Sequence, residues 1–250
     1  MWLPGWLGRS YAKLYSCFNL DLFDFKQACG ALRSDEQKAR LVLSRLKRAG
    51  YLTLFSKVGR KRNYRLLDPS LVVFALGGDL EGYAEVQGSY VRLLLLFLRK
   101  ILERYGNKVF SIVLYGSVAR GRAEKNSDVD LLLIIDGLPL SYSKRIEELV
   151  SLEFDESIRC ELAFLRKEGY STDLTYIPLT PDEAKSFRLL FLDVLTDGVR
   201  LLDRDSFFEK LSNEFLGRLS SLGAKKVKVG DGLWYWVLKP DIKFGEMVQI

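Results

Sequence analysis

The residues best suited to chemistry lie in two short motifs, YGS and SDVD. Gly116 lets the backbone approach a ligand closely, and Ser117 stands where a short helix would begin, so that free amides and a hydroxyl favour a phosphate group. Asp128 and Asp130 lie two residues apart at the start of an apolar run, which places both carboxylates on one face of a strand. Two adjacent carboxylates repel each other unless a cation lies between them, so this pair indicates a site for Mg²⁺ or Mn²⁺.

A phosphate site beside a divalent cation is the arrangement that in-line attack on a phosphoryl group requires. A third carboxylate on an adjacent strand would activate the incoming hydroxyl, and Asp173 is the best-placed candidate because it opens the run DLTYIPL. The alternative stays open that Asp173 merely faces solvent, as most aspartates do. The chain contains no histidine, which excludes Ser-His-Asp and Cys-His catalysis and zinc sites with histidine ligands.

Apolar runs surround both motifs and predict the elements that position them. Residues 109–115 and 129–135 are continuously apolar, which is typical of strands buried on both faces. Alternating residues predict a third strand over 173–179. Helical periodicity predicts three helices, over 89–105, 142–168 (with a break expected) and 182–196. The fold class is therefore α/β (α+β), a small mixed sheet with helices packed on it.

The segment GSVARGRAEKNSDVDL resembles the signature of the DNA polymerase β-like nucleotidyltransferase superfamily. The closest resemblance is to its minimal nucleotidyltransferase branch, which shows GSxARGxAxxxSDxDL, and every fixed position of that pattern is present. The resemblance covers about residues 89–205. It implies nucleotide binding by Gly116, Ser117, Arg120 and Ser127, and a catalytic metal site at Asp128, Asp130 and Asp173. For Arg120 the alternative stays open that it only holds the loop in place.

The activity that this resemblance implies is transfer of a nucleoside monophosphate from an NTP to a hydroxyl acceptor. Some minimal nucleotidyltransferases resemble antitoxins that modify a HEPN-type partner, so a protein acceptor stays open beside a nucleic acid. The tail GLWYWVLKPDIKFGE is similar to the ending of an archaeal subset of these proteins. The competing hypothesis is a DNA-binding regulator that uses the same fold as a nucleotide sensor or partner platform.

The stretch 33–65 is strongly basic, with eleven Lys or Arg against Asp35 and Glu36. Its net charge of +9 contrasts with −3 for the rest of the chain and favours an anionic partner. Within it, apolar residues recur at helical spacing after a cap at Ser34 or Asp35, and Gly50 ends the helix. The inward residues of this helix are Ala39, Val42, Leu43, Leu46 and Ala49. YLTLFSKVGRKRNYRLL follows as two strands joined by a loop that carries Lys57, Arg60, Lys61 and Arg62.

This order of elements looks like a winged helix-turn-helix domain, in which the second helix of the pair enters the major groove and the wing contacts phosphates. The expected DNA-binding residues are Gln37, Arg40, Ser44, Lys47, Arg60, Lys61 and Arg62. Duplex DNA is favoured over RNA only because of the resemblance. A winged helix that contacts protein instead is the alternative.

At 250 residues the chain has room for one large or two modest domains. The predicted divisions are a winged-helix domain (1–76), a Gly-rich linker (77–88), the transferase domain (89–205) and an extension (206–250). The extension contains a helix at about 206–221 and a hairpin that turns at 230–232. Trp234 and Trp236 share one face of that hairpin and are expected in a core rather than against a base. The apolar run 93–98 is too short to span a bilayer, which needs about 20 residues, and a cytoplasmic protein is expected, with a dimer as one open possibility.

Overall fold

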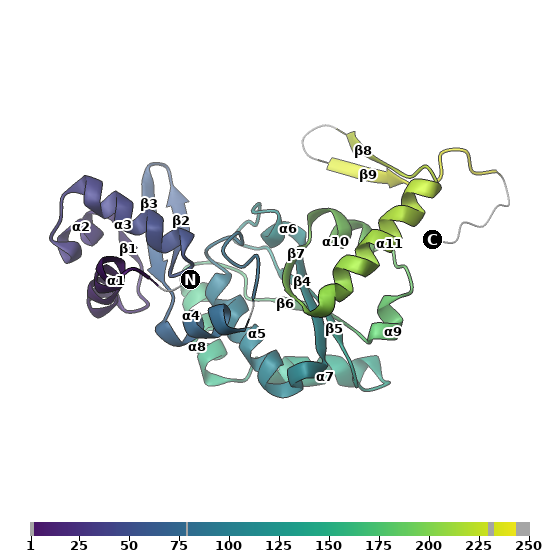
Figure 1. The fold of residues 1–250 in the computed structure, drawn as a ribbon, viewed down its shortest axis with the longest axis horizontal. Coiled ribbons are helices and arrows are strands. Elements are labelled where there is room, and N and C mark those ends of the chain that lie inside the picture. Colours follow the sequence, from purple (N-terminus) through teal and green to yellow (C-terminus); the bar gives the residue numbers. More distant parts are fainter. Residues whose placement is uncertain (1–2, 79, 230–232, 244–250) are drawn as a thin grey trace.

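The computed structural model describes residues 3–78, 80–229 and 233–243 as a mixed α/β protein with three small sheets (Figure 1). A three-stranded antiparallel sheet, in the order β1-β3-β2, belongs to the N-terminal part. The elements of this part are α1 (Gly5–Phe18), β1 (Phe23–Asp24), α2 (Phe25–Leu32), α3 (Glu36–Arg48), β2 (Leu52–Val58), β3 (Lys61–Leu66) and α4 (Pro69–Gly77). They are called the N-terminal unit below.

The predicted basic helix is confirmed as α3, and its cap is Asp35, whose carboxylate accepts a hydrogen bond from the amide of Lys38 at 2.8 Å. Four of the five apolar positions expected to face inward are buried, whereas Ala49 is only half-buried. The predicted wing loop is wrong in extent. Lys57, Lys61 and Arg62 lie in the paired strands β2 and β3, and Gly59 with Arg60 makes a two-residue turn. Gly59 has a φ of +58°, which such a tight turn favours.

The central sheet has the order β6-β5-β4-β7, with β5 and β6 parallel and the other pairs antiparallel. The predicted strands are confirmed as β4 (Val109–Tyr115), β5 (Val129–Ile135) and β6 (Leu174–Leu179), the last of which begins one residue after Asp173. The edge strand β7 (Val199–Asp203) was not predicted. Its register is set by pairing with β4 and not by a local pattern, because only Leu201 and Leu202 are buried.

Helices cover both faces of this sheet. The remaining elements of the central part are α5 (Val91–Tyr105), η1 (Gly106–Lys108), α6 (Gly116–Ala119), α7 (Tyr142–Leu152), α8 (Glu156–Lys167), α9 (Pro181–Ala184) and α10 (Phe191–Asp197). The expected break in 142–168 is confirmed, since Asp155 caps α8. The single helix expected over 182–196 is wrong, because that stretch splits into α9 and α10.

Alternate residues of β4 and β5 enter two hydrophobic cores. Ile112 and Leu131 join a core that contains residues of α5 and α8 and continues into the N-terminal unit. Val113 and Leu132 join a smaller core with residues of α10 and of α11 (Phe207–Ser221), which follows the short helix η2 (Arg204–Ser206). The period-2 alternation of a strand therefore places helices on both sides of the sheet (Figure 1).

The segment expected to be a linker is packed against both parts of the chain. Leu80, Tyr83 and Val86 are buried, and the amide of Glu81 donates to the carbonyl of Leu201 at 3.0 Å. These apolar residues are interspersed among glycines and acidic residues, so the composition of the segment concealed them.

The C-terminal part consists of the predicted helix, confirmed as α11, and a hairpin of β8 (Lys225–Val229) and β9 (Leu233–Val237). The predicted turn at 230–232 lies outside the described residues. Trp234 and Trp236 share one face of β9 but are only partly buried and belong to neither core, so the expectation of a core position is wrong. Two strands alone have too little surface to bury large rings. Among the described helices, none combines the length and apolarity that a membrane span requires.

Candidate functional site

The YGS and SDVD motifs meet at one end of the central sheet. Antiparallel pairing of β4 with β5 places Tyr115 opposite Asp130, so Gly116 at the start of α6 lies beside that aspartate. Gly116 has a φ of +75°, and a Cβ atom there would collide with Oδ2 of Asp130. The positive φ favours glycine at this position, and the missing side chain leaves room for Asp130 close to the backbone. The short helix begins at Gly116, one residue earlier than predicted, and Ser117 is half-buried in its first turn.

The two carboxylates of SDVD differ in environment. Asp128 is exposed at the mouth of β5, whereas Asp130 is half-buried. Burial raises the pKa of Asp130, the negative charge of Asp128 raises it further, and the positive charge of Arg120 partly opposes both. Repulsion of this kind between neighbouring carboxylates is relieved by a cation with a preference for oxygen ligands. The chemistry of the pair therefore fits Mg²⁺ or Mn²⁺.

Asp173 lies next to this pair but is separate from it. The amide of Val129 donates to the carbonyl of Asp173 at 3.0 Å, and the parallel register of β5 and β6 places Asp173 beside Asp128. Ser171 contacts both neighbours, since its hydroxyl lies 3.4 Å from Oδ1 of Asp128 and 3.4 Å from the amide of Asp173. Within the described ranges, no three His, Cys, Asp or Glu side chains gather closely enough to hold a metal. The structure thus brings Asp128 and Asp130 together and leaves Asp173 exposed at the same rim.

The other two expected nucleotide-binding residues already have protein partners. Arg120 forms an ion pair of 3.5 Å with Asp197 of α10. The hydroxyl of Ser127 accepts a hydrogen bond from the amide of Glu124 at 3.0 Å, which closes a turn in the loop between α6 and β5. Ser127 therefore shapes the loop, and Asp197 competes with a phosphate for the Arg120 guanidinium.

Asp193, Asp197 and Lys226 also lie near the motifs, and sequence reasoning missed them. Asp197 pairs with Lys226 of β8 at 3.8 Å as well as with Arg120. The Lys226 ammonium lies 3.9 Å from the centre of the Trp234 ring. Burial raises the pKa of Asp193, and Arg120 lowers it. The one local signal was the spacing of the two aspartates, four residues apart in FLDVLTDG, which places them on one helix face.

All seven residues expected to bind DNA are exposed. Six of them lie on α3 or β3, and Arg60 lies in the turn between β2 and β3. Two of them carry partners at the surface. Arg40 pairs with Glu36 at 3.1 Å and stacks over the Phe25 ring, and Lys61 lies 3.9 Å from Asp24. The basic charge of this region is therefore presented to solvent and remains available to an anionic partner.

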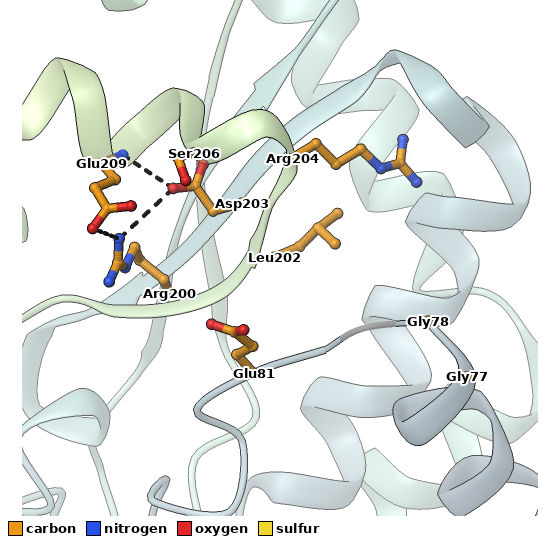
Figure 2. A pocket seen from close by; sticks show the side chains of 9 residues that line it. All are labelled: Gly77, Gly78, Glu81, Arg200, Leu202, Asp203, Arg204, Ser206 and Glu209. Atoms are coloured by element: carbon orange, nitrogen blue, oxygen red, sulfur yellow. Dashed lines mark hydrogen bonds and ion pairs between the residues drawn. The ribbon is translucent and has the colours of Figure 1, made fainter.

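A polar cavity of about 520 Å³ lies away from the motifs. Figure 2 shows that Arg200 turns toward Asp203 and Glu209, at 3.9 and 3.4 Å, while Arg204 points away. Asp203 also accepts a hydrogen bond from the amide of Glu209 at 3.0 Å. Asp203 pairs with Ser111 of β4, whereas the motifs follow Tyr115 at the other end of that strand. Arg200 is paired with carboxylates and Arg204 donates to the carbonyls of Gly106 and Val109, so the lining is a poor site for the phosphates of a nucleotide.

Comparison with known proteins gives a match to a family model and a similar archaeal protein. Residues 96–173 match the family model of the nucleotidyltransferase domain. A protein of Methanocaldococcus jannaschii named "Putative protein adenylyltransferase" is 32% identical over 113 residues, which are 45% of this chain and 71% of the relative. Solved structures of a toxin-antitoxin with AMP-PNP and of a mutant toxin-antitoxin MntA-HpeT are 18% and 19% identical, each covering 50% of this chain and 86% of theirs at a TM-score of 0.34. At that TM-score, the structural likenesses carry no inference.

Proposed function

Because the chain belongs to the nucleotidyltransferase domain family and is a nucleotidyltransferase enzyme, we propose that it transfers AMP from ATP to a hydroxyl group of a protein. The observation that carries this proposal is the placement of Gly116 and Ser117 directly beside Asp130 and Asp128 at one sheet end. The name of the archaeal relative supports ATP as the donor and protein as the acceptor. The acceptor oxygen bonds to the α-phosphorus, the bond to pyrophosphate breaks, and pyrophosphate leaves.

In this proposal each motif residue has a separate role. Gly116 and Ser117 bind the phosphates through backbone amides and the serine hydroxyl. Asp128 and Asp130 would hold Mg²⁺ or Mn²⁺, which when bound neutralises negative charge on the phosphates. Asp173, which is exposed beside Asp128, accepts the proton of the attacking hydroxyl. Arg120 exchanges Asp197 for a phosphate oxygen, and Ser127 keeps the loop closed.

The test is incubation of the purified protein with Mg²⁺ and α-labelled ATP, in the presence of candidate acceptors. These acceptors are the chain itself, co-purifying proteins, a HEPN-type protein and RNA. We expect label on protein for the wild type and none for Asp128→Ala/Asp130→Ala. Asp136→Ala is the matched control, because Asp136 is an exposed aspartate just beyond the opposite end of β5. Equal labelling by the wild type and the double variant would refute the proposal, and label on RNA alone would replace the protein acceptor.

A second function, binding of duplex DNA, is supported by the exposed basic residues of α3 and the β2–β3 hairpin. We propose that residues 1–76 are a winged-helix domain, joined through 77–88 to a transferase domain (89–205) with a C-terminal extension (206–250). Gel shifts at low salt would compare the wild type with Arg60→Ala/Lys61→Ala/Arg62→Ala. We expect weaker binding and a shallower salt dependence for the variant, since fewer phosphates are neutralised.

The matched control for DNA binding is Lys144→Ala/Lys167→Ala/Arg188→Ala, which removes the same charge from exposed positions of the central part. Loss of affinity in both triple variants to the same degree would show that net charge alone attracts DNA. Unchanged affinity in both would contradict a DNA-binding role, and the N-terminal unit would then be assigned to protein contact.

A further inference from the structure

Residues 87–90, here called the strap, lie between the N-terminal unit and the loop of residues 120–127, here called the signature loop. The strap consists of the last two residues of the segment expected to be a linker and the first two of the predicted transferase domain, and it precedes the residues 96–173 that match the family model. Its contacts on both sides are specific hydrogen bonds and close backbone packing, and they bear directly on the nucleotide site.

On the side of the signature loop, Gln87 forms a reciprocal pair of hydrogen bonds with the backbone of Ala123. Nε2 of Gln87 donates to the Ala123 carbonyl at 3.1 Å, and the Ala123 amide donates to Oε1 of Gln87 at 3.1 Å. The hydroxyl of Tyr90 donates to the carbonyls of Ser127 at 3.2 Å and Glu124 at 3.4 Å. Burial raises the pKa of Tyr90 to about 12, so its hydroxyl remains a donor at neutral pH.

On the side of the N-terminal unit, the strap is fixed to β2. The buried hydroxyl of Ser89 donates to the Phe55 carbonyl at 2.8 Å. A Cβ atom at Gly88 would collide with the backbone of Leu54, so only glycine permits this approach. The ring of Tyr170 packs edge-on against both Phe55, at 5.3 Å between ring centres, and Tyr90, at 5.9 Å. Each strap residue therefore has its place set by the N-terminal unit or by the loop.

The signature loop is held from more than one side: the amide of Ser171 donates to the Lys125 carbonyl, and Nζ of Lys125 donates to the Glu168 carbonyl at 2.8 Å. Six of its eight residues are exposed: Arg120, Gly121, Arg122, Glu124, Lys125 and Asn126. Its end leads directly into Asp128, so a shift of the loop moves that carboxylate relative to Ser117. Lys47 of α3 and Gly121 of the loop also line one groove of about 250 Å³. The N-terminal unit and the loop thus border the same groove.

We propose that Gln87 and Tyr90 are positioning residues of the nucleotide site, and that the strap makes the N-terminal unit a structural part of that site. This inference rests on the proposed function for its catalytic consequence. The strap acts by holding the signature loop, and with it Asp128, at a fixed distance from the phosphate-binding turn at Gly116 and Ser117. Part of the support for the loop, at Ala123, Glu124 and Ser127, therefore comes from residues outside the matched family domain.

The test uses the full chain with Gln87→Met, which removes both hydrogen bonds to Ala123, and Gln87→Glu, which retains an acceptor for the Ala123 amide. Tyr90→Phe removes only the hydroxyl. Tyr105→Phe is its matched control. Tyr105 is the last residue of α5, the helix that begins directly after Tyr90, and its hydroxyl donates to Glu148 at 2.9 Å, away from the loop.

The first readout is amide hydrogen exchange over residues 120–128, which does not require activity. We expect exchange of the Ala123 amide to accelerate about tenfold in Gln87→Met, as loss of the hydrogen bond that this amide donates predicts. Exchange should stay slow in Gln87→Glu and Tyr105→Phe. The second readout is AMP transfer. We expect kcat to fall between about 10-fold and 100-fold in Gln87→Met and Tyr90→Phe, with a much smaller change in KM for ATP and an intermediate kcat in Gln87→Glu.

Exchange as slow as in the wild type in both Gln87→Met and Tyr90→Phe would overturn the inference, as would kcat values equal to that of Tyr105→Phe. If the wild type transfers no AMP to any acceptor, the proposed function fails, but the exchange measurement still decides whether the strap holds the loop. Far-ultraviolet circular dichroism and melting temperature identify a variant that fails to fold. If Gln87→Met does not fold, the result for Tyr90→Phe, which keeps the buried ring, decides the test.

Discussion

Two groups of carboxylates in this protein meet opposite electrostatic environments. At the sheet end, Asp130 is half-buried beside Asp128, and its pKa is raised by burial and by that neighbour. At the joint between the N-terminal unit and the central part, the side chain of Glu161 is fully buried between two arginines. The first group carries a negative charge that its protein neighbours do not neutralise, and the second is fully paired.

The joint is built from three elements that lie far apart in sequence. Arg65 of β3 contacts Glu161 of α8 through two hydrogen bonds of 2.5 and 2.9 Å, and Arg92 of α5 adds a third at 2.5 Å. The Arg65 guanidinium also stacks over the ring of Phe164 at 3.7 Å. The difference between the two groups teaches that unneutralised charge marks a place for a ligand, whereas fully paired charge marks a structural contact.

The largest expected effect is at Asp130, where a substitution should lower activity without lowering stability. Under the proposed function, we expect Asp130→Asn to lower the rate of AMP transfer by about 1,000-fold, because loss of a ligand to the proposed metal would remove several kcal/mol of charge stabilisation. Its melting temperature should equal or exceed that of the wild type, since burial and Asp128 already disfavour the charged form. Labelled transfer and thermal unfolding are the measurements. A variant with nearly full activity would remove Asp130 from the site.

The opposite result is expected at the joint. Glu161→Gln should lower the free energy of unfolding by about 3–5 kcal/mol, because it leaves the buried Arg65 without its ion-pair partner and Arg92 with only Asp68, at 3.6 Å. Chemical denaturation measures this loss. If the variant unfolds at the wild-type denaturant concentration, the joint contributes no net stability and the comparison with the sheet end breaks down.

Acid should weaken a third, partly exposed pair. The hydrogen bonds from Arg145 lower the pKa of Glu183 from 4.5 to about 2. A carboxylate with a lowered folded pKa contributes stability that is present above pH 4.5 and is lost as the pH falls toward 2. We expect the melting temperature to fall over this window, with a smaller fall in Glu183→Gln. If the melting temperatures of the wild type and Glu183→Gln fall equally with pH, other carboxylates govern the response to acid.

The smallest effect is expected at the surface of α3. Glu36 pairs with Arg40 at 3.1 Å, but both side chains are mostly exposed, at 71% and 68%. Glu36→Ala should change the free energy of unfolding by less than about 1 kcal/mol, because water and salt screen such a pair. Denaturation at low and high salt tests this prediction. A loss as large as that of Glu161→Gln would mean that burial does not control the strength of these ion pairs.

Several parts of the fold and site were predictable because their signals are local. The apolar runs of β4 and β5 and the helical period of α3 are confirmed at or near the predicted residues. The spacing of Asp128 and Asp130 on one strand face also required only the alternation of side chains. The split of 182–196 into α9 and α10 was missed because each of the two helices spans fewer than eight residues, too few for a clear periodic signal.

By itself, the sequence determined the motifs, their spacing and the charge asymmetry, all of which depend on residues close together in the chain. Only the tertiary structure decided which residues from elsewhere join them: Gln87 at the signature loop, Asp197 with Lys226 at Arg120, and Glu161 at Arg65. The physical reason is that a helical or strand period specifies which face of an element is apolar. Which distant side chain meets that element follows from packing of the whole core, and no local pattern encodes it.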